Sequence, residues 1–225
     1  MQSIPKISVV IPTHQMEDRA FFLVRSFRAL LSQSFKGFEV IVTDNSLDDV
    51  IENICKDSLW KELHIKYFRN DDSRPKGIAQ NTNEAIKRAT GELIKILYLD
   101  DRLHHEKSLQ VIVDSFKGNW LATACIHDDG NCIYSPHTPS FSPEDGDNYV
   151  GSPSVITIKN EDPLLFDENM SWLLDLDYYK RLYNKYGMPV LCSDVNVCIG
   201  IHEGQLTNLL SDEEKRKEVS YLWKK

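Results

Sequence analysis

The sequence lacks several features that mark specialised classes of protein. Its five cysteines are odd in number and show no Cys-x-x-Cys spacing, which argues against a disulfide framework and against a zinc ribbon. The first residues have no basic stretch, apolar stretch and cleavage site of a signal peptide, and no apolar run approaches the ~20 residues that span a bilayer. We therefore expect a cytoplasmic protein with free thiols.

Positive charge is also scarce. The 225 residues carry 26 lysines and arginines against 34 aspartates and glutamates, a formal net charge of −8. Because nucleic-acid binding normally relies on clustered lysine and arginine, we expect no nucleic-acid partner. A small anionic ligand held through a metal ion remains compatible with this charge.

The chain does contain an alternation of apolar strands and amphipathic helices. Strand patterns occupy residues 6–14, 38–46, 63–70 and 93–99, and apolar residues at helical spacing lie between them. Such alternation predicts right-handed crossovers and an α/β fold with a mostly parallel sheet. The length suits one domain.

The second half of the sequence is less regular. It has strand patterns at 119–127, 154–160 and 190–202, and a helical pattern at 171–187. Residues 128–149 are rich in Asp, Ser, Pro and Gly, which predicts a long mobile loop over the ligand cleft. In the first half, we expect Gly91 to cap the helix of residues 77–92.

Polar residues follow each strand of the first half. Because ligands of parallel α/β sheets gather at the carboxyl ends of the strands, we expect these residues to face one cleft. They are Thr13 and His14, Asp44 and Asn45, residues 70–72, and Asp100 with Asp101.

The two adjacent aspartates suggest a metal site. Carboxylates side by side repel each other, so a cation beside them favours the ionised form of both. Carboxylate oxygens suit Mg²⁺ or Mn²⁺, which in turn bridges phosphate oxygens. A metal-bound diphosphate is the ligand that this pattern favours. The alternative is a solvated pair that caps the following helix.

Five segments, in order, resemble glycosyltransferase family 2, the inverting enzymes of GT-A fold, over nearly the entire chain. They are ISVVIPTH, FEVIVTDNSLDD, NTNEAIKRATGELIKILYLDD, GSPS and FDENMSWLLDLDYYKRLYNKYG. The resemblance implies a Rossmann-like three-layer α/β/α fold in a single domain, residues 1–225. Residues 1–101 would form the nucleotide-sugar half, residues 102–210 the acceptor half, and residues 211–225 a C-terminal helix.

The resemblance also implies which residues contact the nucleotide: Pro12, Thr13, Asp44, Lys76 and Asn83. The Asp44 carboxylate would accept a hydrogen bond from an imino N–H of the base. Each role has a structural alternative, such as a strand-end turn for Thr13, a helix N-cap for Asp44 and a solvated loop for Lys76.

For the metal, the resemblance gives Asp100 the binding place and implies Mn²⁺ or Mg²⁺ as the cofactor. Tyr98 stands where many relatives have the first aspartate of Asp-x-Asp, so the ribose-contacting carboxylate is missing or displaced. Asp101 is either a second ligand or the residue that fixes Asp100. His202 resembles a late histidine that many GT-A enzymes send back to the metal or the diphosphate.

Asp175 falls at the catalytic-base position of the family, with Leu174 in place of the usual glutamate. Inversion requires a carboxylate that takes the proton of the acceptor hydroxyl while this oxygen attacks the anomeric carbon. Apolar neighbours would desolvate Asp175 and raise its basicity. The alternative is a helix-start carboxylate stabilised by the macrodipole.

The resemblance thus implies an inverting transfer of sugar from a nucleotide-diphosphate donor, most commonly a UDP-sugar in this family, to a hydroxyl of a saccharide or lipid-linked acceptor. One alternative is a nucleotidyltransferase, although its glycine-rich phosphate loop is absent from IPTHQMEDRA. Another is a non-catalytic sugar-nucleotide-binding relative, which would need no base at Asp175. The basic stretch KRKEVSYLWKK fits either a solvated helix or peripheral contact with a membrane surface.

Overall fold

The structure is a computed structural model and describes residues 6–14, 20–70, 77–142 and 149–225. Within these ranges, nine strands form one sheet in the order β3-β2-β1-β4-β8-β6-β9-β5, and β7 pairs with β6. The strands are β1 (Ile7–Thr13), β2 (Phe38–Asp44), β3 (Ile65–Arg69), β4 (Leu93–Ile96), β5 (Arg102–Leu103), β6 (Trp120–Asp128), β7 (Ile133–His137), β8 (Ile156–Lys159) and β9 (Val190–Gly200).

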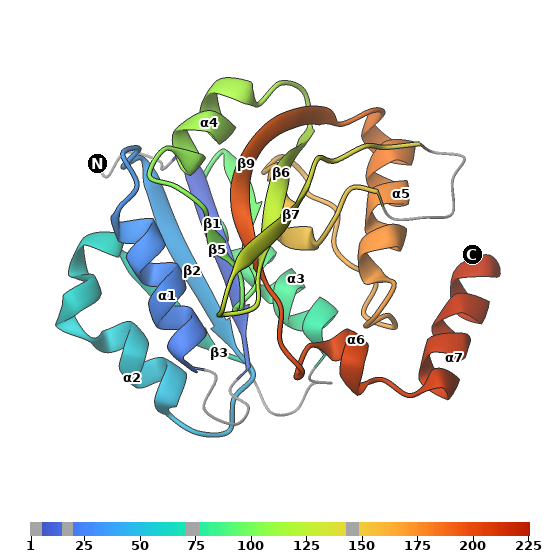
Figure 1. Ribbon diagram of the computed structural model, residues 1–225, viewed down its shortest axis with the longest axis horizontal. Coiled ribbons are helices and arrows are strands. Elements are labelled where there is room, and N and C mark those ends of the chain that lie inside the picture. The colour runs from blue at the N-terminus through green and yellow to red at the C-terminus, as the bar shows by residue number, and fades with distance from the viewer. Residues whose placement is uncertain (1–5, 15–19, 71–76, 143–148) are drawn as a thin grey trace.

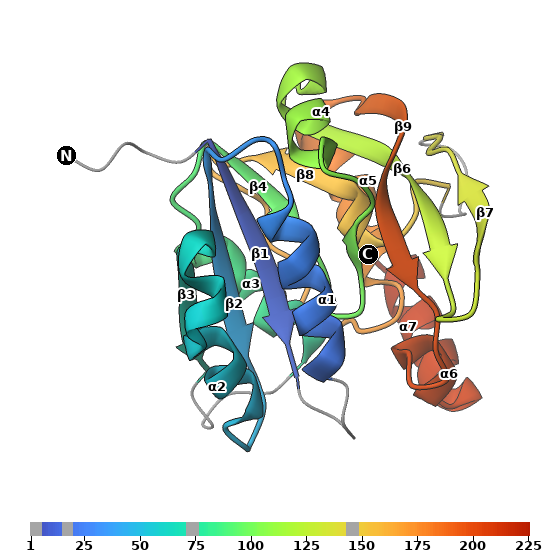
Figure 2. The same ribbon diagram turned by 60° about the vertical axis from the view of Figure 1, so that its left-hand side comes forward.

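The sheet is mostly parallel. β1 pairs in parallel with β2 and β4, β2 with β3, and β6 with β9, whereas β8 is antiparallel to both β4 and β6. Two successive antiparallel pairings give β6 and β9 the same direction as β1. The carboxyl ends of β1, β2, β6 and β9 therefore lie at one edge of the sheet, as their arrowheads in Figure 2 show.

Helices cover both faces of this sheet. They are α1 (Ala20–Leu31), α2 (Val50–Lys56), α3 (Ile78–Arg88), α4 (Ser108–Ser115), α5 (Leu174–Tyr186), α6 (Leu206–Leu209) and α7 (Asp212–Trp223), with short 3-10 turns η1 (Ser58–Leu63) and η2 (Pro153–Val155). Figures 1 and 2 show α1 and α2 on one face of β1 and β2, and α3 on the other. The predicted three-layer α/β/α architecture is confirmed.

The core explains the long apolar runs of the sequence. Every residue of β1 and β2 is buried, because helices cover both faces of these strands. From α1, Leu23, Phe27 and Leu30 are fully buried, which matches their helical spacing.

The predicted cap at Gly91 is wrong. α3 ends at Arg88, and the extended residue Ala89 follows it. Gly91 instead lies against β1, where its backbone N–H donates to the Ser8 hydroxyl at 2.8 Å. A Cβ atom at Gly91 would lie 2.7 Å from the Ser8 nitrogen, so the position excludes a side chain because of close packing.

The segment 128–149 is not one long loop. Residues Ile133–His137 form β7, which pairs antiparallel with the end of β6 through Asp128 and Ile133. Residues 143–148 lie outside the described part of the chain. The strand predicted at 93–99 is also shorter and ends at Ile96, because the chain turns before Asp100.

The described residues contain no helix that is both long enough and apolar enough to cross a membrane. All five cysteines are free thiols, as predicted.

Candidate functional site

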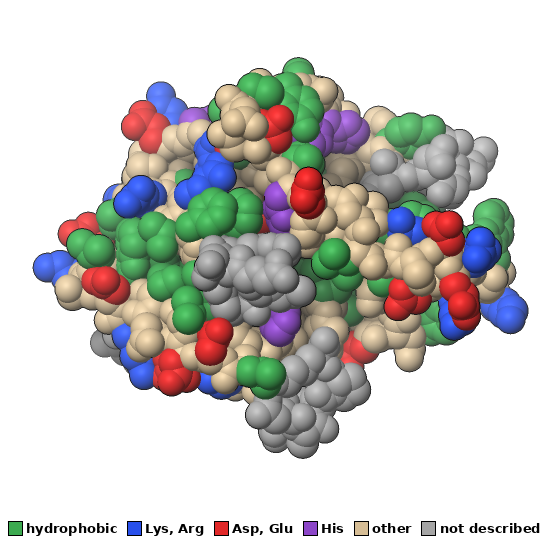
Figure 3. Space-filling model, turned by 60° about the horizontal axis from the view of Figure 1, so that its bottom comes forward, with side chains coloured by type: hydrophobic (Ala, Val, Ile, Leu, Met, Phe, Trp, Pro, Cys, Tyr) green, Lys and Arg blue, Asp and Glu red, His purple; other side chains and the backbone are tan. Residues whose placement is uncertain are grey.

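A pocket of about 490 Å³ opens at the carboxyl ends of the strands. It draws residues from the ends of β1 and β9, the turn after β4, η2 and the start of α5. Those named below are Pro12, Thr13, Asn45, Asn81, Tyr98, Asp100, Asp101, Ser152, Ser171, Trp172, Leu174, Asp175 and His202. Figure 3 views the molecule from this end, and histidine side chains lie near the middle of the face.

Asp100 and His202 meet in this pocket. His202 Nε2 lies 3.0 Å from Asp100 Oδ2, and both side chains are partly exposed. The turn after β4 carries Asp100, and the residues after β9 carry His202. The ring centre of Phe22 from α1 lies 5.0 Å from that of the His202 imidazole, so the two rings are in contact. The structure thus brings together two of the three residues predicted for the metal.

Asp101 borders the pocket, but its carboxylate is held by contacts within the protein. The residue is only 3% exposed. Oδ1 accepts the Gly200 N–H at 2.9 Å, and Oδ2 accepts the Ser152 hydroxyl at 3.5 Å. Burial, together with the charge of Asp100, raises the pKa of the Asp101 carboxyl well above its ordinary value. These contacts favour the reading in which Asp101 fixes Asp100 rather than binding the metal.

Gly200 makes this arrangement possible. A Cβ atom at Gly200 would lie 2.3 Å from the backbone oxygen of Asp100. The end of β9 can therefore approach the turn that bears both aspartates only because residue 200 has no side chain.

Lys95 is not among the residues predicted from the sequence to lie at the site. This lysine is fully buried in β4, and its ammonium group donates to the backbone oxygen of Ser154. Burial lowers the pKa of Lys95 to about 7, although the nearby charge of Asp101 acts in the opposite direction. A lysine inside the apolar run LIKILYL was the signal in the sequence, because a charged residue is seldom buried without a partner.

Asp175 is the second residue of α5 and lines the pocket. Its Oδ1 atom accepts the backbone N–H of Leu176 at 2.7 Å. Trp172 and Leu174 line the pocket beside it, which gives this side of the pocket an apolar character. The structure therefore brings the predicted base into the same pocket as Asp100 and His202.

Tyr98 lines the pocket where the family pattern has an aspartate. Its hydroxyl oxygen is buried. Burial raises the pKa of the Tyr98 phenol, and the charges of Asp175, Asp101 and Asp100 raise it further. Residue 98 thus presents an uncharged phenol among three carboxyl groups.

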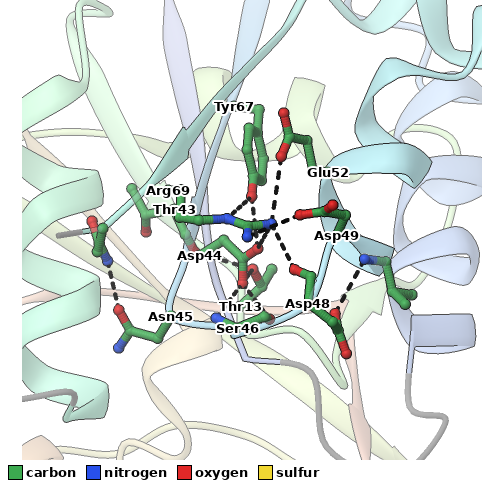
Figure 4. Close-up of polar contacts among 12 residues, drawn as sticks. Thr13, Thr43, Asp44, Asn45, Ser46, Asp48, Asp49, Glu52, Tyr67 and Arg69 are labelled. Carbon is green, nitrogen blue, oxygen red and sulfur yellow. Dashed lines mark hydrogen bonds and ion pairs between the residues drawn. The ribbon is translucent and has the colours of Figure 1, made fainter. Parts of the chain in front are cut away.

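Pro12 and Thr13, two of the predicted nucleotide contacts, line the pocket, whereas Asp44 is not among its lining residues. The Asp44 carboxylate is 0% exposed and accepts hydrogen bonds from the Ser46 N–H at 2.8 Å, the Thr13 hydroxyl at 3.3 Å and the Tyr67 hydroxyl at 2.8 Å. Figure 4 shows these donors around the carboxylate. The carboxylate predicted to contact the base is therefore fully buried in the structure.

Asn83 does not face the pocket. Its amide nitrogen donates to the backbone oxygen of Phe166 at 2.9 Å, and its amide oxygen accepts the Phe166 N–H at 2.7 Å. Asn81 lines the pocket instead, and its amide nitrogen donates to the backbone oxygen of Thr13 at 2.8 Å. Lys76, the remaining predicted contact, lies outside the described residues.

Asp100 and His202 fit a divalent cation. The described residues contain no cluster of three or more His, Cys, Asp or Glu side chains arranged for a metal. However, adjacent ligands of an octahedral ion with bonds of about 2.1 Å are about 3.0 Å apart, which matches the distance between Asp100 Oδ2 and His202 Nε2. Mg²⁺ sites of this kind commonly use one or two protein ligands and take the others from phosphate and water.

The relatives of this chain among known proteins include named glycosyltransferases. The chain is 36% identical over 104 residues to the GalNAc(5)-diNAcBac-PP-undecaprenol beta-1,3-glucosyltransferase of Campylobacter jejuni, covering 44% of this chain and 31% of that one. It is 32% identical over 144 residues to an uncharacterized glycosyltransferase of Rickettsia conorii, covering 61% and 22%. The matches therefore span about a third or less of these curated relatives.

The fold has a close counterpart among solved structures. TarS residues 1–349 from S. aureus, in complex with UDP-GlcNAc, superposes with a TM-score of 0.75 at 21% identity, covering 96% of this chain and 65% of that one. At this identity the likeness establishes the fold. The model of the family described as glycosyl transferase family 2 matches residues 8–190, most of the chain. The chain therefore belongs to glycosyl transferase family 2.

Proposed function

We propose that this protein is an inverting glycosyltransferase that moves a sugar from a nucleotide-diphosphate donor to a hydroxyl group. The observation that carries the proposal is the meeting of Asp100, His202 and Asp175 in one pocket at the carboxyl ends of the strands. Asp100 and His202 form a pair suited to a metal-bound diphosphate, and Asp175 is a carboxylate suited to proton abstraction.

The donor side of the pocket belongs to residues 1–101 in this proposal. Thr13 and Asn45 line it at the ends of β1 and β2, and Asn81 lies next to them. UDP is the expected nucleotide, in agreement with the UDP-GlcNAc in the TarS complex. The Asp44 carboxylate accepts the Thr13 hydroxyl and thereby helps to hold Thr13 in place.

Asp100 and His202 would hold a Mn²⁺ or Mg²⁺ ion against the diphosphate. Such an ion, when bound, neutralises charge that develops on the leaving diphosphate. Asp101 keeps Asp100 in place by binding the N–H of Gly200, two residues before His202.

Asp175 would take the proton of the acceptor hydroxyl. The acceptor oxygen attacks the anomeric carbon, and the bond from that carbon to the diphosphate oxygen breaks, so the configuration inverts. The proton passes to the Asp175 carboxylate. The apolar side chains of Trp172 and Leu174 limit water beside this carboxylate, which favours its action as a base.

The acceptor belongs to residues 102–210 and is a saccharide or a lipid-linked glycan in this proposal. The name of the Campylobacter jejuni relative includes an undecaprenol-linked glycan, which supports a lipid-linked acceptor. A lipid-linked acceptor would require contact of the protein with a membrane surface, from the cytoplasmic side.

A thermal-shift screen of UDP, GDP and TDP, with and without Mn²⁺, tests the donor side. We expect Mn²⁺-dependent stabilisation by UDP in the wild type and none in Asp100→Ala. The absence of a response to every nucleotide in the wild type would overturn the proposal.

The Asp175→Asn variant tests the base. We expect it to bind UDP with Mn²⁺ like the wild type, and to lose release of UDP from a UDP-sugar with water as the acceptor. Undiminished release in this variant would show that another group acts as the base. UDP binding without any UDP release by the wild type would favour a non-catalytic relative.

A further inference from the structure

Helix α5, which carries Asp175, begins without a cap of its own. Its N-cap residue is Leu173, whose apolar side chain offers no acceptor. The first backbone N–H groups of a helix have no partners inside the helix, and an apolar N-cap residue leaves them without one from the usual side chain. Inside α5, the Asp175 carboxylate accepts the first-turn N–H of Leu176. The backbone N–H groups of the residues just before the helix need acceptors from elsewhere in the chain.

Glu218 of α7 is the acceptor for the three residues that precede α5. Its Oε1 atom accepts the N–H of Ser171 at 2.8 Å, and its Oε2 atom accepts the N–H groups of Trp172 at 2.8 Å and Leu173 at 2.9 Å. Glu218 lies 45 residues beyond the nearest of these residues. One carboxylate thus holds three consecutive backbone groups that lead directly into α5.

Two of these three residues, Ser171 and Trp172, line the pocket. Leu174 and Asp175 of α5 line it as well. The backbone that Glu218 holds is therefore the backbone from which the pocket wall and the proposed base project. Figure 1 shows α7 at the lower right of the molecule, near the end at which α5 begins.

Further polar contacts dock α7 on this region. Lys225 Nζ donates to Asp167 Oδ2 at 2.6 Å and to Asp177 Oδ1 at 2.7 Å, and the Tyr221 hydroxyl donates to Asp167 at 3.0 Å. The Lys215 ammonium lies 5.5 Å from the ring centre of Trp172. Every residue of α7 is half-buried or exposed, so polar contacts contribute much of the attachment.

We infer that Glu218 is a positioning residue, which fixes the backbone of residues 171–173 and thereby holds Asp175 and Trp172 in the pocket. This inference rests on the proposed function in one respect, the role of Asp175 as the base. The C-terminal helix, which the sequence alone left as a solvated or membrane-facing segment, then completes the acceptor side of the site.

Replacing Glu218 by glutamine tests these hydrogen bonds at nearly constant side-chain size. A carboxylate has two acceptor oxygens, whereas a glutamine amide has one acceptor oxygen and a nitrogen that only donates. In Glu218→Gln, the amide nitrogen would face at least one backbone N–H. At least one of the three hydrogen bonds would therefore be lost. Glu218→Ala would remove all three.

The matched control is Glu213→Gln. Glu213 lies on the same helix, pairs with Lys217 at 2.7 Å and is well exposed, away from α5. Its substitution replaces the same residue type with the same amide on the same helix, and the described contact of Glu213 is with Lys217 rather than with residues 171–173.

The experiment compares these variants with the wild type in three measurements: hydrogen exchange of the 168–176 backbone, affinity for UDP with Mn²⁺, and release of UDP from a UDP-sugar. We expect faster exchange in Glu218→Gln and more so in Glu218→Ala. UDP affinity should stay within about twofold, while kcat for release falls about tenfold or more. Glu213→Gln should match the wild type throughout.

Two results would overturn the inference. Unchanged exchange of residues 168–176 in Glu218→Ala would show that the carboxylate does not hold this backbone. Faster exchange with an unchanged kcat would show that holding it does not position the base. Failure of the proposed function has another signature, since the wild type itself would then release no UDP, while the exchange comparison would still decide whether Glu218 holds residues 171–173.

Discussion

The imidazole nitrogen Nε2 of His202 lies 3.0 Å from Oδ2 of Asp100, although 102 residues separate the two in the sequence. Their contact joins the turn after β4 to the end of β9. The two side chains lie at the spacing that adjacent ligands of an octahedral ion adopt. The contact ties the end of β9 to the turn after β4 within the pocket.

We predict that His202→Ala weakens the Mn²⁺-dependent binding of UDP. Loss of the imidazole removes one of two protein ligands in the proposed site, and weakening of tenfold or more is on the order seen when metal sites lose supporting groups. Calorimetric titration of UDP at fixed Mn²⁺ measures this. The control is His64→Asn, because His64 is exposed with a φ of 50°, a conformation that asparagine tolerates. Equal affinities in His202→Ala and wild type would contradict the prediction.

We predict that Asp101→Ala lowers the free energy of unfolding more than Asp100→Ala does. Asp101→Ala leaves the buried N–H of Gly200 without its acceptor, so the free energy of unfolding should fall by about 2 kcal/mol or more. Asp100→Ala removes a partly exposed carboxylate and should cost less. Urea unfolding of both variants measures the difference. If the two lose the same stability, Asp101 does not have the structural role assigned to it.

The buried Lys95 should make stability depend on pH. Its pKa is about 7 in the fold and 10.5 in a model compound, so the unfolded chain binds more protons between these values. The free energy of unfolding should therefore rise from pH 7 towards pH 10 and reach its full value above the unfolded pKa. In Lys95→Met this rise should be smaller. Parallel stability curves for the two proteins over this range would refute the prediction.

Gly91→Ala should destabilise the fold through overpacking. The added Cβ atom would lie 2.7 Å from the Ser8 nitrogen and 2.8 Å from the carbonyl carbon of Ile7, both of which belong to the β1 backbone. A cost of about 1–3 kcal/mol is typical of such overpacking. Thermal unfolding against Gly77→Ala provides the comparison, because a Cβ atom at Gly77 has no described neighbour within 4 Å. Similar melting temperatures for the two variants would contradict the prediction, because the β1 backbone would then accommodate the added Cβ atom without a loss of stability.

The sequence predicted the fold and the edge at which the site lies, because both follow from local patterns. Continuous apolar strands alternating with helices dictate a parallel sheet, and the carboxyl ends of such strands share one edge. Thr13 and Asp100 could be placed near the cleft for this reason, whereas Asp175 was placed there through the family resemblance.

Other residues could not be placed from the sequence because their roles depend on rotation or on distant contacts. Residues 81 and 83 of α3 differ by about 200° around the helix axis, so only one of them faces the cleft, and a motif does not say which. The contact of Asn83 with Phe166 and that of Glu218 with Trp172 each join segments that are far apart in the chain. Glu218 also lies beyond the residues that the family pattern covers.

The close approach of Gly200 to Asp100 has a consequence for synthesis of the protein. The residues that line the donor side of the pocket come early in the chain, but Gly200 and His202 come late, and β9 pairs with β6 along its length. A nascent chain that has reached only the end of β8 already has Asp100 but not its partners. The Asp100–His202 pair therefore forms only once the last strand has been made and inserted, so partial translation products are expected to bind no donor.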